Sequence, residues 1–234
     1  MRPTLLAWAL LAAAIGFAAS PLLAPGFNGF EPDQFPIPQD NPPVQPAGYA
    51  FAIWGLIYLW LIAGSAFGAL RRASSADWTP MRAPLLASLG PGILWLPLAQ
   101  VSVLGATLLI WWMLVMALAA LIRTGTEDRW WQVTPVALYA GWLTAASSVS
   151  IGLVLAGYGL LGGTWAALVS LAIALAIALA VQARMQKAPE YGLAVIWALV
   201  GVIVANTGPL NWPVAGLAGF GIVAILALRS QEAD

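Results

Sequence analysis

Aromatic side chains are the residues of this sequence best suited to hold a ligand. In the stretch PAGYAFAIWGLIYLW, residues 46–60, Trp54 and Tyr58 are four positions apart and share one face of a helix. In a later apolar segment Tyr139 and Trp142 are three positions apart and share a face in the same way. Rings with a polar N–H or O–H edge make good walls for a planar, mostly apolar molecule. The spacing therefore predicts a binding site for such a molecule.

The aromatic residues fall into two sets according to their place in the apolar segments. The candidate ligand-binding residues, which lie in or near the second, third and fifth segments, are Tyr49, Phe51, Trp54, Tyr58, Trp95, Tyr139 and Trp142. Another set lies near segment ends, where Trp and Tyr concentrate at the membrane–water interface: Trp8, Trp78, Trp130, Trp131 and Trp212. For the first set the alternative role is packing between helices without a ligand.

Several kinds of chemistry are excluded by residue types that the sequence lacks. Histidine and cysteine are both absent, so a Ser/His/Asp triad and a metal site with His or Cys ligands are impossible. No acidic residue lies in the middle of an apolar segment, which argues against a proton-coupled pump. We expect no catalytic residue, no metal site and no required cofactor, and hence a protein that is not an enzyme.

Composition identifies the elements that must position these side chains. The chain is 62% hydrophobic and 8% charged, whereas a soluble domain is about 25% charged. Its partner is therefore the lipid bilayer, and a net charge of zero argues against nucleic acid. A spanning helix needs about 20 apolar residues. We predict an all-α polytopic transmembrane helical bundle with about eight spans. They cover residues 4–23, 47–70, 82–99, 101–122, 130–158, 160–183, 191–206 and 213–228.

The basic residues support this number of spans. All nine Lys and Arg fall at the termini or in alternate connections, which places them on one side of the membrane. We expect an integral protein of the bacterial cytoplasmic membrane with both termini cytoplasmic. The segment after Arg2 also resembles a signal peptide, whose cleavage would leave seven spans. Because Pro21 directly follows the cleavage-like Ala18-Ala19-Ser20, we favour its retention as the first helix.

The long connection APGFNGFEPDQFPIPQDNPPVQP, residues 24–46, is rich in proline and carries three acids and no base. Proline fixes φ and lacks an N–H donor, so the segment is expected to be extended rather than helical. It predicts either a stiff cover over the helices or a solvated spacer.

Two of these stretches resemble the TspO/MBR family of tryptophan-rich sensory or translocator proteins. The second-helix signature of that family is Pro-Gly-Trp-x-Phe-Pro-Pro-x-Trp-x-x-x-Tyr. The residues that match it in kind are Pro46, Gly48, Tyr49, Phe51, Trp54 and Tyr58, with Tyr49 in place of Trp and one residue fewer before Trp54. LYAGWLTAASSVS resembles the fifth-helix pattern through Tyr139, Trp142 and Ala146. In the third segment Trp95 remains from the family's Asn-x-x-Trp motif, with Gly92 at the Asn position.

The resemblance implies a division of the chain and a class of ligand. It covers about residues 3–158, so we expect a TspO-like five-helix region over 1–158 and an additional three-helix region over 159–234. Family members bind porphyrin-type tetrapyrroles inside the five-helix bundle, and many form homodimers. The expected function is thus sensing or transport of a hydrophobic small molecule, with a tetrapyrrole as the ligand and a homodimer as the assembly.

Other functions stay open at this point. A permease for a small apolar or zwitterionic solute would use the Gly- and Pro-containing third segment and the turn at Asn206. Light-driven porphyrin breakdown is an enzymatic alternative, and a membrane subunit without a ligand is the plainest one.

Overall fold

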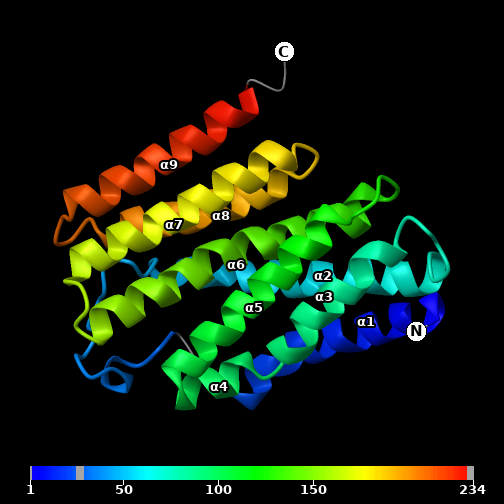
Figure 1. Cartoon of the computed structure of the whole chain (residues 1–234), viewed down its shortest axis with the longest axis horizontal. Helices are drawn as coiled ribbons and strands as arrows, with labels where there is room; N and C mark the ends of the chain where they lie inside the picture. Colours follow the sequence, from blue (N-terminus) through cyan, green and yellow to red (C-terminus); the bar gives the residue numbers. More distant parts are fainter. Residues whose placement is uncertain (1, 25–28, 231–234) are drawn as a thin grey trace. The chain divides into compact units, whose positions relative to one another are not determined.

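Apolar helices make up most of the chain (Figure 1). The computed structural model describes residues 2–24 and 29–230. Its α-helices are α1 (Pro3–Ala19), α2 (Ile53–Arg71), α3 (Thr79–Gly92), α4 (Trp95–Val101), α5 (Val103–Ile122), α6 (Arg129–Gly157), α7 (Gly163–Arg184), α8 (Pro189–Ala205) and α9 (Trp212–Ser230). Short 3-10 turns at Ser20–Leu23, Pro32–Gln34 and Gly48–Ala52 complete the secondary structure.

Local sequence sets several of the helix ends. Proline stands at the first position of α1 and of α8, where its missing N–H is not needed. Ser102 leaves helical geometry with φ −152° and ψ 104°, and its hydroxyl accepts a hydrogen bond from the Gly105 N–H. That N-cap separates α4 from α5.

The helices confirm the fold class predicted from the sequence, an all-α polytopic membrane bundle. Among the described residues, six helices are long and apolar enough to span a membrane, and a seventh span results if α3 and α4, bent by 40°, count as one. The apolar helix α8 has 17 residues, as many as α1, but α1 continues through the 3-10 turn to Leu23, which gives a segment of 21 residues. The eight segments expected from the sequence correspond to these six helices, the bent pair and α8.

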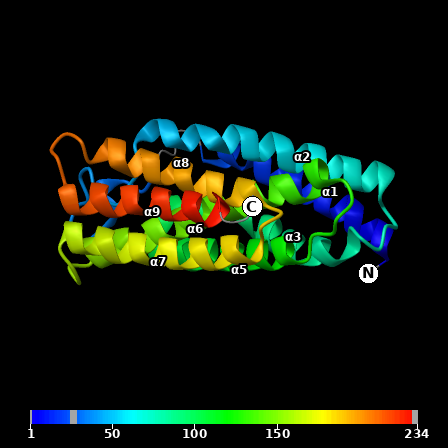
Figure 2. The ribbon, with the colours of Figure 1, turned by 90° about the horizontal axis from the view of Figure 1, so that it is seen from above.

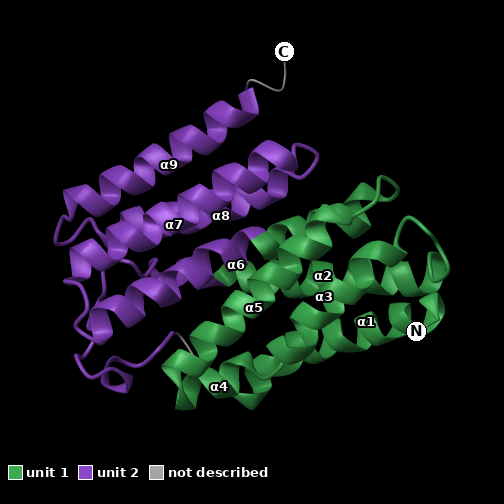
Figure 3. Cartoon of the chain, in the orientation of Figure 1, with its two compact units in different colours: residues 1–27, 52–140 green, residues 28–51, 141–234 purple. Residues whose placement is uncertain are grey.

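The chain divides into two compact units (Figure 3). Unit 1 consists of residues 1–27 and 52–140, and unit 2 of residues 28–51 and 141–234. The boundary falls inside α6, and the Pro-rich connection groups with the last three helices. The division expected from the resemblance, at residues 158 and 159, stays a prediction.

In unit 1, α1 packs against α2 and α3, and α5 packs against α3 and α4. Most buried side chains of these helices are apolar, among them Ile57, Leu85, Leu89, Met113 and Leu114. In the same unit, aromatic side chains of α1, α2 and the first part of α6 meet.

In unit 2, α9 packs against both α7 and α8, and α8 runs opposite to its two neighbours (Figures 1 and 2). The buried Gln182 of α7 accepts a hydrogen bond from the Gly192 N–H of α8 at 3.1 Å. The turn at residues 206–211, which joins α8 to α9, lies beside the Pro-rich connection.

Candidate functional site

Four aromatic rings from three helices form one cluster in unit 1. Trp54 and Tyr58 of α2 stack with ring centroids 5.2 Å apart and planes inclined by 20°. Phe17 of α1 meets both rings edge-on, at 5.8 Å from Trp54 and 5.4 Å from Tyr58. Tyr139 of α6 contacts Phe17 at 5.7 Å and lies 6.5 Å from Trp54. We call these four residues the aromatic cluster.

The hydroxyl of Tyr139 is fixed by a hydrogen-bond chain across three helices. It lies 2.9 Å from the Ser88 Oγ of α3, which donates to the Met113 carbonyl of α5 at 2.8 Å. Tyr139 and Ser88 are both fully buried. A buried hydroxyl needs such partners. These hydrogen bonds hold the Tyr139 ring in place on the inner side of the cluster.

The close packing of Phe17 depends on a residue without a side chain. A Cβ added to Gly92 would lie 2.9 Å from the Met113 Cε and 3.1 Å from the Phe17 Cε2. Any side chain at this position would push Phe17 away from its ring partners. Since the rings already fill the inner side, a flat ligand would have to stack on Trp54 and Tyr58, which keep partial exposure.

The other predicted site residues occupy three further positions. In unit 2, Phe51 meets Trp142 edge-on at 5.8 Å, and Tyr49 meets Trp197 of α8 edge-on at 5.5 Å. Trp95 begins α4 in unit 1, where its indole N–H donates to the Ala106 carbonyl of α5 at 2.9 Å. The structure thus joins Trp54, Tyr58 and Tyr139 in one cluster and pairs Phe51 with Trp142 in the other unit.

The Pro-rich connection is tied down in unit 2. The Ala47 N–H donates to the Gly201 carbonyl at 3.0 Å, and the Asn206 side-chain amide donates to the Pro43 carbonyl at 2.8 Å. Near the middle of the connection, the Ile37 N–H donates to the Gly157 carbonyl at 2.9 Å. These bonds favour a packed segment over a solvated spacer.

Four of the five indoles expected in the membrane belt are exposed, and their place in the belt stays a prediction: Trp8, Trp130, Trp131 and Trp212. Trp130 is exposed, stacks on Trp60 at 6.3 Å and lies under the Arg129 guanidinium at 5.0 Å. Trp78, which we expected in the belt, is only 1% exposed. Its N–H donates to the Asp128 carboxylate at 3.1 Å, so this indole is drawn into the connection between α5 and α6.

Sequence reasoning missed three residues of this arrangement: Phe17, Ser88 and Trp197. Ser88 carried a usable signal, since a hydroxyl in an apolar segment needs a partner. Phe17 and Trp197 carried none, because their partners come from distant parts of the chain.

None of the clustered residues is charged, and none is His, Cys, Asp or Glu. Over residues 2–24 and 29–230, no group of three or more His, Cys, Asp or Glu side chains is placed to hold a metal ion. The arrangement can therefore bury and stack an apolar molecule and offer it Tyr and Trp hydrogen bonds.

Comparison with known proteins gives one match. A family model described as TSPO-like protein matches residues 27–229, a range that extends through α7 and α8 and most of α9. The curated proteins and the solved structures gave no match.

Proposed function

The chain belongs to the TSPO-like protein family, and from that premise we propose that it binds a planar hydrophobic small molecule, most simply a tetrapyrrole, within the membrane. Membership agrees with the resemblance seen in the second and fifth segments. We propose sensing or transport of that molecule as the physiological role, and a homodimer as the working assembly.

The observation that carries the proposal is the stacked pair of Trp54 and Tyr58. Edge-on contacts from Phe17 hold both rings, and the Ser88 hydrogen bond holds Tyr139 behind them. Rings fixed in this way lose little rotamer freedom when a ligand stacks on them, so more of the contact energy becomes affinity. Each aromatic contact contributes about 0.5–1.5 kcal/mol beyond the burial of apolar area.

Titration of the purified full chain with a porphyrin, followed by the absorption band of the pigment, tests this proposal. Replacing Trp54 and Tyr58 by Ala together removes two contacts, and we expect affinity to fall about tenfold to a hundredfold. Trp165→Ala is the matched control, because Trp165 of α7 is 66% exposed and lies in the other unit. Equal affinity in the double variant and the control would exclude this pair as the ligand's platform.

Illumination of the loaded protein separates binding from catalysis. We propose binding alone, because the cluster offers no acid, base or metal ligand. Bleaching of the bound pigment that requires Trp54 would instead support light-driven breakdown.

The bend between α3 and α4 favours a second candidate, a permease for a small apolar or zwitterionic solute. Broken helices in transporters supply unpaired backbone groups to a substrate. Here the break lies between Gly92 and Trp95, with a 40° bend. A permease would move solute into protein-containing liposomes at a rate that depends on this break, whereas a binder would show saturable binding without flux.

A further inference from the structure

A groove in unit 2 lies where the turn between α8 and α9 meets the Pro-rich connection. Its volume is about 710 Å³, which is within the range of small-molecule sites. It is lined by Asn41, Pro43, Thr164, Asn206, Trp212 and the 208–211 turn. This Asn206 groove contains none of the candidate ligand-binding residues, and an inference about it does not depend on the proposed function.

Asn206 supplies an unused acceptor to this groove. Its side chain is only 3% exposed, and its amide nitrogen donates to the carbonyls of Pro43 and Val202, each at 2.8 Å. Among the described residues no side chain or backbone N–H donates to its Oδ1 atom, and this atom is not closed off from solvent. An acceptor that is open in a groove can receive an N–H or O–H from a guest.

The remaining lining is neutral and includes one aromatic ring. Thr164, in the first turn of α7, accepts a hydrogen bond from the Asn211 side chain at 3.0 Å, which closes one side of the groove. Trp212, the first residue of α9, is 72% exposed and presents an open indole. An indole face attracts cations, and ammonium groups in particular.

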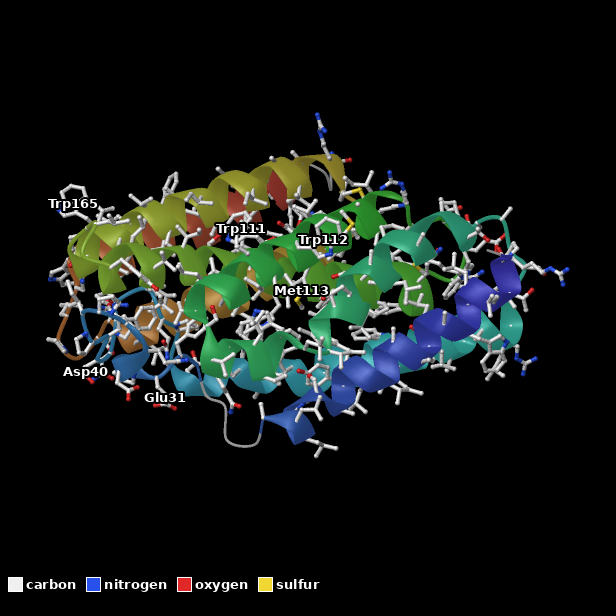
Figure 4. The ribbon with its side chains drawn as sticks, turned by 60° about the horizontal axis from the view of Figure 1, so that its bottom comes forward. Glu31, Asp40, Trp111, Trp112, Met113 and Trp165 are labelled. Carbon is white, nitrogen blue, oxygen red and sulfur yellow. The ribbon has the colours of Figure 1, made fainter. Side chains whose placement is uncertain are left out.

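Charges within unit 2 distinguish between possible guests. Glu31, Asp33 and Asp40 all lie in the Pro-rich connection, and Asp40 lines two pockets that adjoin the groove at Asn41 and Pro43. Figure 4 shows Glu31, Asp40 and Trp165 at the same end of this unit. The bases of unit 2 lie at the opposite helix ends: Arg184, Lys187 and Arg229.

The acids of the Pro-rich connection lie near the groove and the bases of unit 2 lie far from it, which favours a cation in the groove. With 22 residues, α7 separates Thr164 from Arg184 by about 30 Å, which is several Debye lengths at physiological salt. Within unit 2 the groove therefore experiences acidic neighbours and no nearby base. The carbonyl end of α8 at Ala205 adds partial negative charge.

We propose that the Asn206 groove binds a small solute through a primary ammonium group. The ammonium donates to Asn206 Oδ1 and packs against the Trp212 ring. The N-terminus of α7 at Thr164 tolerates a carboxylate on the same solute, so amino acids and simple amines both satisfy the requirement.

Isothermal titration of the full chain in nanodiscs with three matched two-carbon probes tests the proposal. Ethanolammonium carries the required group, ethylene glycol replaces it with a neutral hydroxyl, and glycolate replaces it with an anion. We expect saturable binding of ethanolammonium, with affinity at least tenfold above that of the other two. Absence of saturable binding, or equal binding of all three, would overturn the proposal.

Two substitutions test whether ethanolammonium binds in the Asn206 groove. Trp212→Ala should weaken ethanolammonium binding about fivefold to tenfold, while Trp165→Ala, an exposed indole outside the groove lining, should leave it unchanged. Asn206→Leu should abolish binding, and circular dichroism checks that this variant is folded. Equal effects of the two Trp variants would overturn the assignment. Porphyrin affinity should be unchanged in Trp212→Ala, which separates failure of this site from failure of the aromatic cluster.

Discussion

Arg82 shows how a single buried residue organises one end of unit 1. Its side chain is 1% exposed, and its guanidinium donates to the carbonyls of Ala73 and Arg72 at 2.7 Å and of Gly68 and Pro3 at 3.3 Å. Those carbonyls belong to the last turn of α2, to the two residues after it and to the start of α1, so one cation joins these two helix ends. Its charge also complements the negative end of the α2 dipole.

Replacing Arg82 by Met should therefore destabilise the fold strongly. The substitution removes the charge-assisted hydrogen bonds to four carbonyls and leaves the Ala73 carbonyl without this donor, and we expect a loss of about 1.5–3 kcal/mol in the free energy of unfolding. Thermal unfolding in detergent measures the loss. Arg71→Met is the control, because Arg71 is exposed at the end of α2 and should change stability by less than about 0.5 kcal/mol. Similar melting temperatures for the two variants would contradict this role.

The ion pair of Arg72 with Asp128 predicts a pH dependence. Arg72 donates to both carboxylate oxygens, at 2.7 and 3.2 Å, and these hydrogen bonds hold the pKa of Asp128 below its ordinary value. A lowered carboxyl pKa contributes stability above the unfolded-state pKa of about 3.9, and that contribution is lost as the pH falls through the folded-state pKa.

Asp128→Asn tests this link. At pH 7 the variant should be less stable than the natural chain by about 1 kcal/mol, the upper range for a partly exposed pair. The difference should vanish at a pH below the folded-state pKa of Asp128. Chemical unfolding at both pH values measures this difference in the free energy of unfolding. A difference that persists or grows in acid would show that the Asp128 charge does not cause it. Asn tolerates the positive φ of 51° at this position.

At this scale, pairs close in sequence could be predicted and distant partners could not. The four-residue spacing of Trp54 and Tyr58 implied a shared face, and the structure stacks the two rings. The partners Phe17 and Ser88 depend on which helices pack together, which periodicity does not encode.

At the scale of elements, hydropathy located the helices and capping chemistry decided where they break. The sequence placed a boundary near Gln100, and the structure places it at Ser102, whose hydroxyl caps α5. The bend between α3 and α4 could be located only to the Gly- and Pro-containing stretch, since proline kinks depend on how neighbouring helices satisfy the freed backbone groups.

Close helix contact in unit 1 depends on Gly64 of α2. A Cβ at this position would overlap the Trp131 carbonyl of α6 and lie 3.3 Å from the Pro135 Cγ. We expect Gly64→Ala to destabilise the protein by about 1–3 kcal/mol, because a backbone carbonyl cannot move aside as a flexible side chain can.

Gly55→Ala is the matched control on the same helix. Nothing lies within 4 Å of the added Cβ, so better helix propensity should leave stability unchanged or raised by up to about 1 kcal/mol. The melting temperatures of the two variants measure the difference in stability. A Gly64→Ala protein as stable as Gly55→Ala would exclude a close approach of Gly64 to the Trp131 carbonyl.

At the scale of the whole molecule, the Pro-rich connection could not be assigned from sequence. It lies between the first two helices along the chain, yet its hydrogen bonds go to the end of α6 and to α8. The partner of Pro43 is more than 160 residues away, at Asn206. Such a pairing is a property of the folded chain, whereas composition showed only that the segment would be extended.

The short apolar helix α8 is the subject of the last prediction, which concerns whether it crosses the membrane. Its 17 residues span about 26 Å, a little less than the hydrocarbon core of about 30 Å. Crossing therefore requires slight thinning of the bilayer, which costs only fractions of a kcal/mol per Å. We predict that α8 crosses, so that Gln186 and Leu210, which flank it, lie on opposite sides of the membrane.

Single cysteines measure this directly, because the natural sequence contains none. A membrane-impermeant maleimide should label Leu210→Cys in intact bacterial cells and Gln186→Cys only in inverted vesicles. Since alternate connections carry the basic residues, two further variants should be labelled in intact cells: Asp40→Cys and Leu160→Cys. Two others should be labelled only in inverted vesicles: Ser74→Cys and Thr126→Cys. Labelling of Gln186→Cys and Leu210→Cys from the same side would leave α8 on the membrane surface.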